Sequence, residues 1–332
     1  MAHAGSVSLI GRPNAGKSTL LNRIIGTKVA IVSDKPQTTR NRILAVKHFD
    51  SPEHANEASA GGQIVFVDTP GIHRPLHRLN VRMVDAAVET LREMDVIALV
   101  FDASTRPGRG DEYVSNLLTH VTQPVVLVLN KIDLVPKAAL LPLMAQAGAW
   151  HDFAAIVPVS AATGDGVDRL ERVLLEQLPE GEPMFPDDYL TDQPERAMAA
   201  EMVREKVLAH TRAELPFSTA VAVDEFDETE RDELLRIYCT IWVEQESQKP
   251  IVIGRGGEMI KRIGTEARHD LERFFGTKVF LDLRVKVNPD WRNNERTLDE
   301  LGVPKRTAKP KRVAKPARDA RPARAAKPRR NR

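Results

Sequence analysis

Gly11–Ser18 has the sequence GRPNAGKS, which matches the pattern G-x-x-x-x-G-K-[ST] of a phosphate-binding loop. The apolar run Ser6–Ile10 before it predicts a strand, and Ser18–Ile25 after it predicts a helix, which is the context that the motif requires. Glycines let backbone N–H groups wrap phosphates, and a helix N-terminus favours negative charge. We expect Lys17 to reach the β- and γ-phosphates and Ser18 to bind Mg²⁺. The nucleotide contacts that this loop predicts are Gly11, Asn14, Ala15, Gly16, Lys17, Ser18 and Thr19.

Short apolar runs alternate with helical stretches over residues 5–178. The predicted strands are Ser6–Ile10, Leu44–Phe49, Gln63–Val67, Val96–Phe101, Val125–Leu129 and Ile156–Val159. The predicted helices are Ser18–Ile25, Asn80–Met94, Glu112–Thr119 and Val167–Leu178. Apolar strands separated by helices predict an α/β domain with a mostly parallel sheet and helices on both faces. The polar stretch Asp50–Gly62 between two strands predicts a long, exposed and mobile hairpin tip.

Two further motifs predict the phosphate end of a nucleotide site. Asp68–Gly71 ends a predicted strand, so the Asp68 carboxylate is placed to hold Mg²⁺ and the Gly71 N–H to meet a γ-phosphate. Thr38 and Thr39 lie in the polar loop after the first helix, and one of these hydroxyls would cap Mg²⁺; the sequence does not decide between them. The predicted metal ligands are Ser18, Thr39 and Asp68, and the predicted catalytic residues are Lys17, Thr39 and Gly71.

Motifs after two later strands predict that the base is guanine. In Asn130–Asp133 (NKID), the Asp133 carboxylate can accept hydrogen bonds from guanine N1 and its 2-amino group, which adenine does not offer. A buried carboxylate without these partners would cost several kcal/mol. Asn130 can bond the guanine edge and the Lys131 stem can lie over the ring. Ser160 and Ala161 end the next strand, where the Ala161 N–H can donate to guanine O6.

Two residues near the phosphates predict how hydrolysis proceeds. Ile72 occupies the position where Ras-like enzymes carry the Gln that orients the attacking water, so intrinsic hydrolysis should be slow. The Asn14 carboxamide is placed to help coordinate a monovalent cation such as K⁺, or else to satisfy its own turn. The sequence leaves both interpretations of Asn14 open.

A second, smaller α+β domain follows the proline-rich stretch Pro179–Pro194, which predicts a linker. Its predicted elements have the order α-β-β-α-α-β: Glu195–His210, Ser218–Val223, Leu234–Glu244, a short turn at Ile251–Ile253, Glu258–Phe275 and an edge strand at Val279–Val287. The sequence VIGRGGEMIK contains the G-x-x-G loop with which type II KH domains clamp about four nucleotides of a single strand. The predicted RNA contacts are Gly254, Arg255, Gly256, Gly257, Lys261 and Arg262.

The formal net charge of +2 hides two regions of opposite sign. Residues 304–332 carry five Lys and eight Arg against Asp319, a net charge of +12, so the preceding 303 residues carry −10. Prolines recur every six residues from Pro304 to Pro328 with almost no large apolar side chain between them. We expect a disordered tail that attracts polyanions, with RNA and an anionic membrane surface as the competing targets.

These motifs divide the chain into a GTPase domain (1–178), a linker (179–194), a KH domain (195–303) and the basic tail (304–332). Cys239 is the single cysteine, which excludes an intramolecular disulfide and predicts a reducing cytosol. No apolar run approaches the ~20 residues of a membrane helix. Trp242 and Trp291 are assigned to the core, with base stacking as an alternative for Trp291, and a metal site at His73 and His77 is disfavoured.

A GTPase domain followed by a KH domain resembles the bacterial Era family over about residues 5–303. The segments that carry the resemblance are Gly11–Thr19, Pro36–Arg40, Asp68–Gly71, Ile72, Asn130–Asp133, Ser160-Ala161, Thr211–Pro216 and Val252–Lys261. The resemblance implies a GTPase that binds GTP, GDP and Mg²⁺, binds the 3′ end of 16S ribosomal RNA and assists maturation of the small (30S) ribosomal subunit. It also implies peripheral association with the inner membrane from the cytoplasm.

We expect a monomer in which GTP orders the loops at Thr38-Thr39 and Gly71–Arg78 and thereby changes how the KH groove is presented to RNA. The alternative is an RNA-binding assembly chaperone in which hydrolysis is incidental. A tRNA-modifying GTPase is disfavoured, because no large helical insert or C-terminal reactive cysteine is present.

Overall fold

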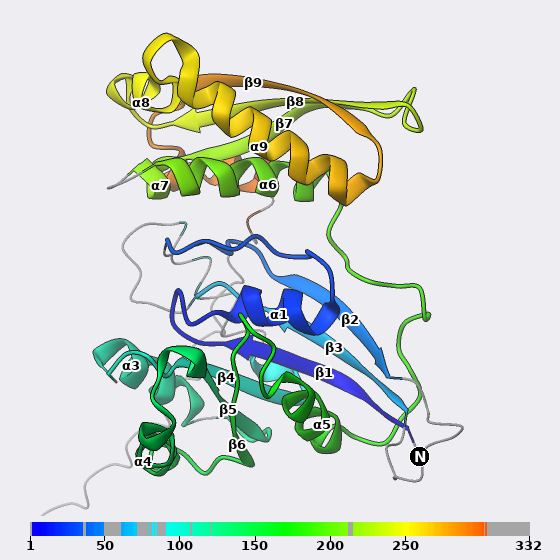
Figure 1. The fold of residues 1–332 in the computed structure, drawn as a ribbon, viewed down its shortest axis with the longest axis vertical. Coiled ribbons are helices and arrows are strands. Elements are labelled where there is room, and N and C mark those ends of the chain that lie inside the picture. Colours follow the sequence, from blue (N-terminus) through cyan, green and yellow to red (C-terminus); the bar gives the residue numbers. More distant parts are fainter. Residues whose placement is uncertain are drawn as a thin grey trace, which may run out of the picture.

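The chain folds into two domains, one stacked on the other (Figure 1). The computed structural model describes residues 2–35, 38–49, 61–71, 91–106, 108–119, 121–211, 215–301 and 303, together with residues 79, 82 and 84. The predicted hairpin tip apart from residues 61 and 62, the basic tail, Ile72, His73 and His77 lie outside the described residues.

The first domain is built on a six-stranded sheet in the order β2-β3-β1-β4-β5-β6. All neighbours are parallel except β2 and β3, which pair as an antiparallel hairpin. The strands are β1 (His3–Ile10), β2 (Ile43–Phe49), β3 (Gly62–Asp68), β4 (Val96–Asp102), β5 (Val125–Asn130) and β6 (Ala155–Pro158). The predicted mostly parallel sheet is therefore confirmed, with strand limits shifted by a few residues.

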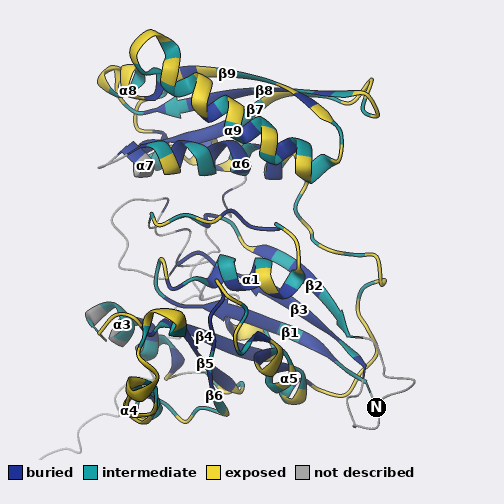
Figure 2. Cartoon of the chain, in the orientation of Figure 1, coloured by how far each residue is buried: buried dark blue, intermediate teal, exposed yellow. Residues whose placement is uncertain are grey.

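Helices cover both faces of this sheet because its strands are apolar on both sides. Along β4, Val96, Ala98 and Val100 pack in one core, and Ile97, Leu99 and Phe101 pack in the other. The first core contains side chains of α1 (Lys17–Ile25) and α5 (Val167–Gln177), and the second those of α3 (Arg109–Leu118) and α4 (Lys137–Gly148). Figure 2 shows the central strands buried and the outward faces of α4 and α5 exposed.

Two helical segments differ from their prediction. Helix α4 is absent from the sequence prediction, because it contains Pro142, exposes Leu141 and has no clear polar and apolar faces. Of the predicted helix 80–94, residues 82, 84 and 91–93 are helical, and the remainder except Met94 lies outside the described residues.

The second domain is a three-stranded sheet, in the order β7-β8-β9, covered on one face by helices (Figure 1). Strands β7 and β8 are antiparallel, and β9 pairs with β8 in parallel at the edge of the sheet, which confirms the predicted edge strand. The elements are α6 (Glu195–His210), α7 (Leu215–Ser218), β7 (Ala220–Asp227), β8 (Leu234–Val243), α8 (Lys249–Ile253), α9 (Glu258–Phe275), β9 (Lys278–Val287) and α10 (Glu295–Glu300). Cys239 is buried in this core, and burial raises the pKa of its thiol to about 12.

Residues 179–194 connect the domains and lie along the edge strand β2. The Val46 N–H donates to the Leu190 carbonyl (2.9 Å), and the Thr191 hydroxyl donates to the Leu44 carbonyl (2.6 Å). Near the other end, the Gln63 side chain accepts from the N–H groups of Met184 and Phe185. This segment forms isolated β-bridges but no helix or longer strand.

The domains meet through an apolar cluster and a polar network. The cluster joins Leu79 of the first domain to Ala220, Trp291, Leu298 and Val303 of the second. Beside it, Arg82 forms ion pairs with Glu295 and Asp299 of α10. Within the described part of the chain, no helix is long and apolar enough to cross a membrane.

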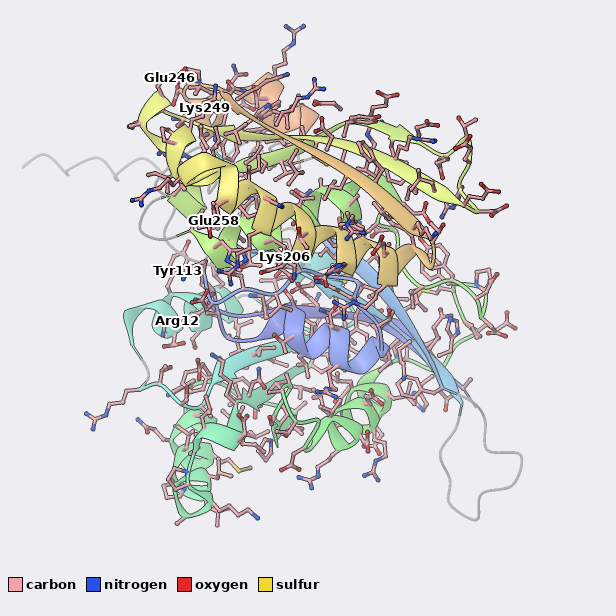
Figure 3. The ribbon with its side chains drawn as sticks, turned by 45° about the horizontal axis from the view of Figure 1, so that its top comes forward. Arg12, Tyr113, Lys206, Glu246, Lys249 and Glu258 are labelled. Atoms are coloured by element: carbon pink, nitrogen blue, oxygen red, sulfur yellow. The ribbon has the colours of Figure 1, made fainter. Side chains whose placement is uncertain are left out.

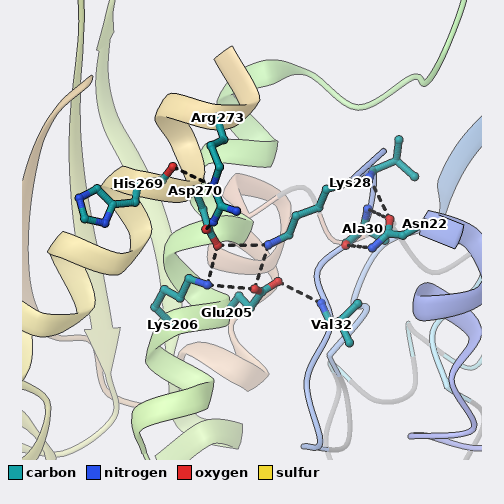
Figure 4. Close-up of polar contacts among 10 residues, drawn as sticks. Asn22, Lys28, Ala30, Val32, Glu205, Lys206, His269, Asp270 and Arg273 are labelled. Atoms are coloured by element: carbon teal, nitrogen blue, oxygen red, sulfur yellow. Dashed lines mark hydrogen bonds and ion pairs between the residues drawn. The ribbon is translucent and has the colours of Figure 1, made fainter. Parts of the chain in front are cut away.

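The polar network is centred on Lys28, in the loop after α1 (Figure 4). Lys28 Nζ lies 2.8 Å from Glu205 Oε1 of α6 and 3.5 Å from Asp270 Oδ2 of α9. Lys206 Nζ bridges the same two carboxylates, and Glu205 Oε2 accepts from the Val32 N–H at 3.0 Å. The loop between α1 and β2 is thus held by both long helices of the second domain.

Candidate nucleotide site and nucleic-acid groove

The phosphate loop leaves its backbone N–H groups available at the start of α1. Gly16 precedes the helix in a left-handed conformation (φ 92°), and no side chain caps this end. A Cβ at Gly16 would lie 2.3 Å from Asn130 Nδ2, so this close approach requires glycine. A pocket of about 380 Å³ opens here and brings most of the predicted phosphate-end residues together. It is lined by residues 13, 14, 16–19, 31–34, 38, 39, 71 and 131.

Lys17 lies buried at the base of this pocket. Its Nζ donates to the carbonyls of Gly11 (3.4 Å) and Arg12 (3.3 Å). Burial lowers the pKa of Lys17, and the nearby Asp68 carboxylate partly opposes that shift. The ammonium group is therefore poorly solvated and suited to bind phosphate oxygens as they enter.

Three side-chain oxygens converge beside Lys17. Ser18 Oγ donates to Asp68 Oδ2 at 2.7 Å and lies 2.8 Å from Thr39 Oγ1, which is itself 3.3 Å from Asp68 Oδ2. Asp68 Oδ1 is buried and has no hydrogen-bond partner among the described residues, and burial raises the pKa of this carboxylate. A set of hard oxygen donors with an orphaned carboxylate oxygen fits Mg²⁺. Among the described residues, no group of three or more His, Cys, Asp and Glu side chains could hold a metal ion.

The structure distinguishes the two adjacent threonines. Thr39 turns its hydroxyl to Ser18 and Asp68, whereas the Thr38 hydroxyl donates to the Lys35 carbonyl at 2.6 Å. Gly71 packs against the phosphate loop so closely that a Cβ there would lie 2.8 Å from Pro13. The backbone after Asp68 therefore approaches the place where a terminal phosphate would bind.

The predicted base end is assembled between the loops after β5 and β6. Asp133 Oδ1 accepts from Ser160 Oγ at 2.6 Å, which orients the carboxylate. Asn130 Nδ2 donates to the Ala15 carbonyl (2.9 Å) and its Oδ1 accepts from the Ala161 N–H (3.0 Å). Both polar atoms of Asn130 thus tie the base-side loops to the phosphate loop, a tie that the sequence prediction for Asn130 and Ala161 did not include.

Lys131 and Asn14 both adopt left-handed backbone conformations beside the pocket. Lys131 Nζ lies 2.6 Å from Asp102 Oδ2, which holds its stem along the pocket wall. Asn14 Nδ2 donates to the Asp34 carbonyl at 2.6 Å. The interpretation in which Asn14 satisfies its own turn is therefore wrong: the side chain bonds a loop twenty residues away.

The G-x-x-G loop joins α8 to α9, which begins at Glu258 (labelled in Figure 3). Gly254, Gly256 and Gly257 have φ angles of 76°, 60° and 82°, and a Cβ on Gly256 would point into open space. Arg255 and Gly256 are exposed, so the loop backbone is accessible to a sugar-phosphate chain.

A groove follows this loop between α9 and β9. Its lining consists of Ile260, Lys261, Gly264, Thr265, Arg268, Leu281 and Leu283. Of the predicted RNA contacts on α9, Lys261 lines the groove, whereas Arg262 forms an ion pair with Glu266 (3.2 Å). The predicted RNA contacts include no residue of β9, although the apolar alternation of Leu281 and Leu283 on an edge strand could have indicated the far wall.

Comparison with known families recognises both domains. The model "50S ribosome-binding GTPase" matches residues 6–131, and the model "KH domain" matches residues 214–292. GTPase Era of Geobacter metallireducens is 50% identical over 299 residues, which cover 90% of this chain and 97% of that protein. GTPase Era of Staphylococcus haemolyticus is 48% identical and covers 90% of this chain and 96% of its own length.

Two solved structures are similar over both domains. A crystal structure of Era with MgGDPNP and nucleotides 1506–1542 of 16S ribosomal RNA matches with a TM-score of 0.84 at 42% identity, over 91% of this chain and 99% of that one. A variant of Aquifex aeolicus Era bound to GDP and AlF4⁻ matches with a TM-score of 0.83, also at 42% identity and over the same shares. Identity at this level over nine-tenths of the chain shows that this protein belongs to the GTPase Era family.

Proposed function

We propose that this protein is a GTP-hydrolysing switch that binds 16S ribosomal RNA through its KH domain and assists assembly of the small ribosomal subunit. The observation that carries the proposal is the convergence of Ser18, Thr39 and Asp68 at a phosphate loop, in a chain whose second domain presents a G-x-x-G groove. The similar Era structure holds MgGDPNP and a 16S ribosomal RNA fragment together.

Each residue at the phosphate end has a distinct role. Lys17 binds the β- and γ-phosphate oxygens, and the Gly71 N–H donates to the γ-phosphate. Ser18, Thr39 and Asp68 would hold Mg²⁺, which, when bound, neutralises charge that develops on the phosphates. Because Thr39 comes from the loop before β2, its contact is available only when that loop is closed over the site. Loss of the γ-phosphate would release the loop.

Selection of guanine rests on the oriented carboxylate of Asp133. Ser160 donates to one of its oxygens and thereby fixes the side chain, and the stem of Lys131 provides an apolar surface for the base. A ring lacking the N1–H and 2-amino donors would leave the carboxylate without partners, which is the basis of large discrimination factors.

The experiment that tests the function is single-turnover GTP hydrolysis with and without an RNA of nucleotides 1506–1542 of 16S ribosomal RNA, the fragment in the similar Era structure. We expect Mg²⁺-dependent hydrolysis, RNA binding, and a change in either the rate or the nucleotide affinity on adding RNA. A parent protein that neither hydrolyses GTP nor binds this RNA would refute the proposal. If the protein hydrolyses GTP and binds RNA, but RNA changes neither the hydrolysis rate nor the nucleotide affinity, the alternative of an RNA-binding assembly chaperone is favoured.

Gly256→Asp tests whether the G-x-x-G loop binds the RNA. The left-handed φ of Gly256 disfavours aspartate, and the new carboxylate would face the open space where the nucleic-acid backbone runs. RNA affinity should fall at least about tenfold, since a buried like charge at an interface costs several kcal/mol, while GDP affinity stays unchanged. Unchanged RNA affinity would remove the groove from the proposal.

Three further features belong to the proposal as finer expectations. The protein acts as a monomer in the cytoplasm, and its basic tail gives it peripheral contact with RNA or with the anionic inner face of the membrane. K⁺ binds beside Asn14, whose side chain bridges the phosphate loop and the loop at Asp34. Replacing KCl by NaCl tests the cation, because equal hydrolysis rates in the two salts would eliminate it.

A further inference from the structure

The segment Thr38–Arg40 lies between the two domains and contacts both of them. Thr39 faces the nucleotide site, where its hydroxyl lies 2.8 Å from that of Ser18. The residues on either side face the KH domain: the Thr38 carbonyl accepts a hydrogen bond from Arg204 of α6, and Arg40 Nη2 donates to the Thr219 carbonyl at 3.0 Å. The predicted Mg²⁺ ligand is therefore flanked by contacts to the other domain.

Arg204 is held rigidly in place. Its side chain is 1% exposed, and its Nε donates to Glu201 Oε1, one turn earlier on α6, at 2.8 Å. The same Nη2 that reaches the Thr38 carbonyl also contacts the Glu201 carboxylate. A planar guanidinium fixed by a carboxylate has little freedom, so the position of α6 is transmitted to the Thr38 carbonyl.

Arg40 secures the other side of Thr39. Its guanidinium carbon lies 5.1 Å from the centre of the Trp291 ring, and Trp291 is fully buried with its Nε1 donating to the Ser218 carbonyl at 2.9 Å. Burial, followed by the charge of Arg204, lowers the pKa of Arg40 to about 9, so the side chain stays charged at neutral pH. A desolvated cation over a tryptophan face is a favourable contact.

Docking alone does not account for this arrangement. Leu79 and Arg82 already join the domains through the apolar cluster and the ion pairs to α10. The Arg204 contact instead acts on the main chain one residue from Thr39, and reacting groups displaced by about 1 Å can lose about a hundredfold in rate. A contact at this place acts on the geometry of the nucleotide site.

We propose that Arg204 is a positioning residue for GTP hydrolysis: the KH domain, through Arg204 on one side and the Arg40–Trp291 contact on the other, holds Thr39 in the position that binds Mg²⁺. This inference rests on the proposed GTPase function. By reciprocity, bound GTP and Mg²⁺ hold Thr39 and thereby favour the docked KH domain by the same free energy.

The test is Arg204→Met in the full chain, which removes the donor but keeps an apolar side chain of similar length. We expect kcat to fall about tenfold and the Mg²⁺ concentration for half-maximal hydrolysis to rise several-fold, because Thr39 loses its support. Affinity for GDPNP with Mg²⁺ should weaken, whereas GDP affinity should stay within twofold, since the proposed role of Thr39 is to hold Mg²⁺ while the γ-phosphate is bound.

Arg196→Ala is the matched control on the same helix. Arg196 donates to the carbonyls of Val223 and Asp224 inside the KH domain, so its loss perturbs that domain without touching Thr38. We expect its kcat and Mg²⁺ dependence to equal those of the parent. If the parent and this control hydrolyse GTP, the proposed GTPase activity stands whatever Arg204→Met does.

If Arg204→Met does not fold, Glu201→Ala tests the positioning role of Arg204. Glu201 has a side chain 31% exposed, and its removal deprives the Arg204 guanidinium of its orienting carboxylate. We expect the same shift in Mg²⁺ dependence, reduced to about threefold. Parental kcat and Mg²⁺ dependence in a folded Arg204→Met, or in Glu201→Ala where that variant alone folds, would overturn the inference.

Discussion

The two ends of the nucleotide site are constructed in different ways. At the base end, Ser160 donates to Asp133, and Asn130 bonds the Ala161 N–H and the Ala15 carbonyl. All of these residues belong to the first domain. At the γ-phosphate end, the residue before Thr39 is bonded by Arg204, which is 166 residues away in the other domain. Base recognition is thus a local property of one domain, whereas the response to the terminal phosphate depends on how the two domains meet.

The largest expected effect is a loss of guanine recognition caused by a substitution at the base end alone. Asp133→Asn replaces the carboxylate by an amide, so the pairing with guanine is lost and xanthine becomes the complementary base. We expect GTP affinity to fall at least about a hundredfold, with selectivity moving to XTP. Competition of GTP and XTP for the site measures the shift.

Asp165→Asn is the control for this change, since Asp165 is an exposed carboxylate in the loop beside Ser160. It should leave both affinities unaltered. RNA affinity should also be unaltered in Asp133→Asn if the base end is as local as the structure indicates. Retained selectivity for GTP in Asp133→Asn would overturn the assignment of the base end.

An intermediate effect separates the two neighbouring threonines. Thr39→Val removes the hydroxyl beside Ser18 and Asp68, and we expect GTP hydrolysis to fall about tenfold or more while GDP affinity is preserved. Thr38→Val removes only a bond to the Lys35 carbonyl and should cost about threefold or less. Comparable losses in the two variants, measured by single-turnover hydrolysis, would contradict the geometry described for this loop.

The smallest expected effect concerns Lys28, the centre of the polar network between the domains. Lys28→Met removes one of two cations from Glu205 and Asp270, and Lys206, labelled in Figure 3, retains its contacts with both. Partly exposed ion pairs contribute about 1 kcal/mol or less, so hydrolysis should fall only about twofold. High salt should erase the difference between Lys28→Met and the parent.

Lys137→Met, at the exposed start of α4, is the control for that measurement and should match the parent at every salt concentration. Guanine selectivity should be parental in both variants. A Lys28→Met protein with altered guanine selectivity would show that the two ends of the site are not separate.

The sequence was sufficient to predict the parts of the site that lie at strand ends. Gly16, Asp68 and Asp133 follow apolar strands of a parallel sheet, and such strands bring their carboxyl ends to one edge. It could not choose between Thr38 and Thr39, because they lie in an irregular loop where no period fixes which side chain points inward. In the structure the Thr39 hydroxyl contacts Ser18 and Asp68, whereas the Thr38 hydroxyl donates to the Lys35 carbonyl.

Residues at the domain interface were not predictable for a related reason. Arg204 lies on a helix where an arginine is usually a solvated residue, but in the folded chain its side chain is buried and contacts the Thr38 carbonyl of the first domain. The core assignment of Trp291 is confirmed, since its side chain is fully buried in the cluster between the domains, but its contact with Arg40 was not predicted. A contact between distant segments leaves no spacing in the sequence from which it could be inferred.

The connecting segment has a consequence for the strength of these contacts. Gln193 still bonds the Arg42 carbonyl, and α6 begins at Glu195, so a single residue separates the anchored connection from the KH domain. So short a tether gives the docking surfaces an effective concentration in the millimolar range or above. Individually weak contacts are therefore made most of the time, and a few kcal/mol from nucleotide or RNA suffices to make or break them.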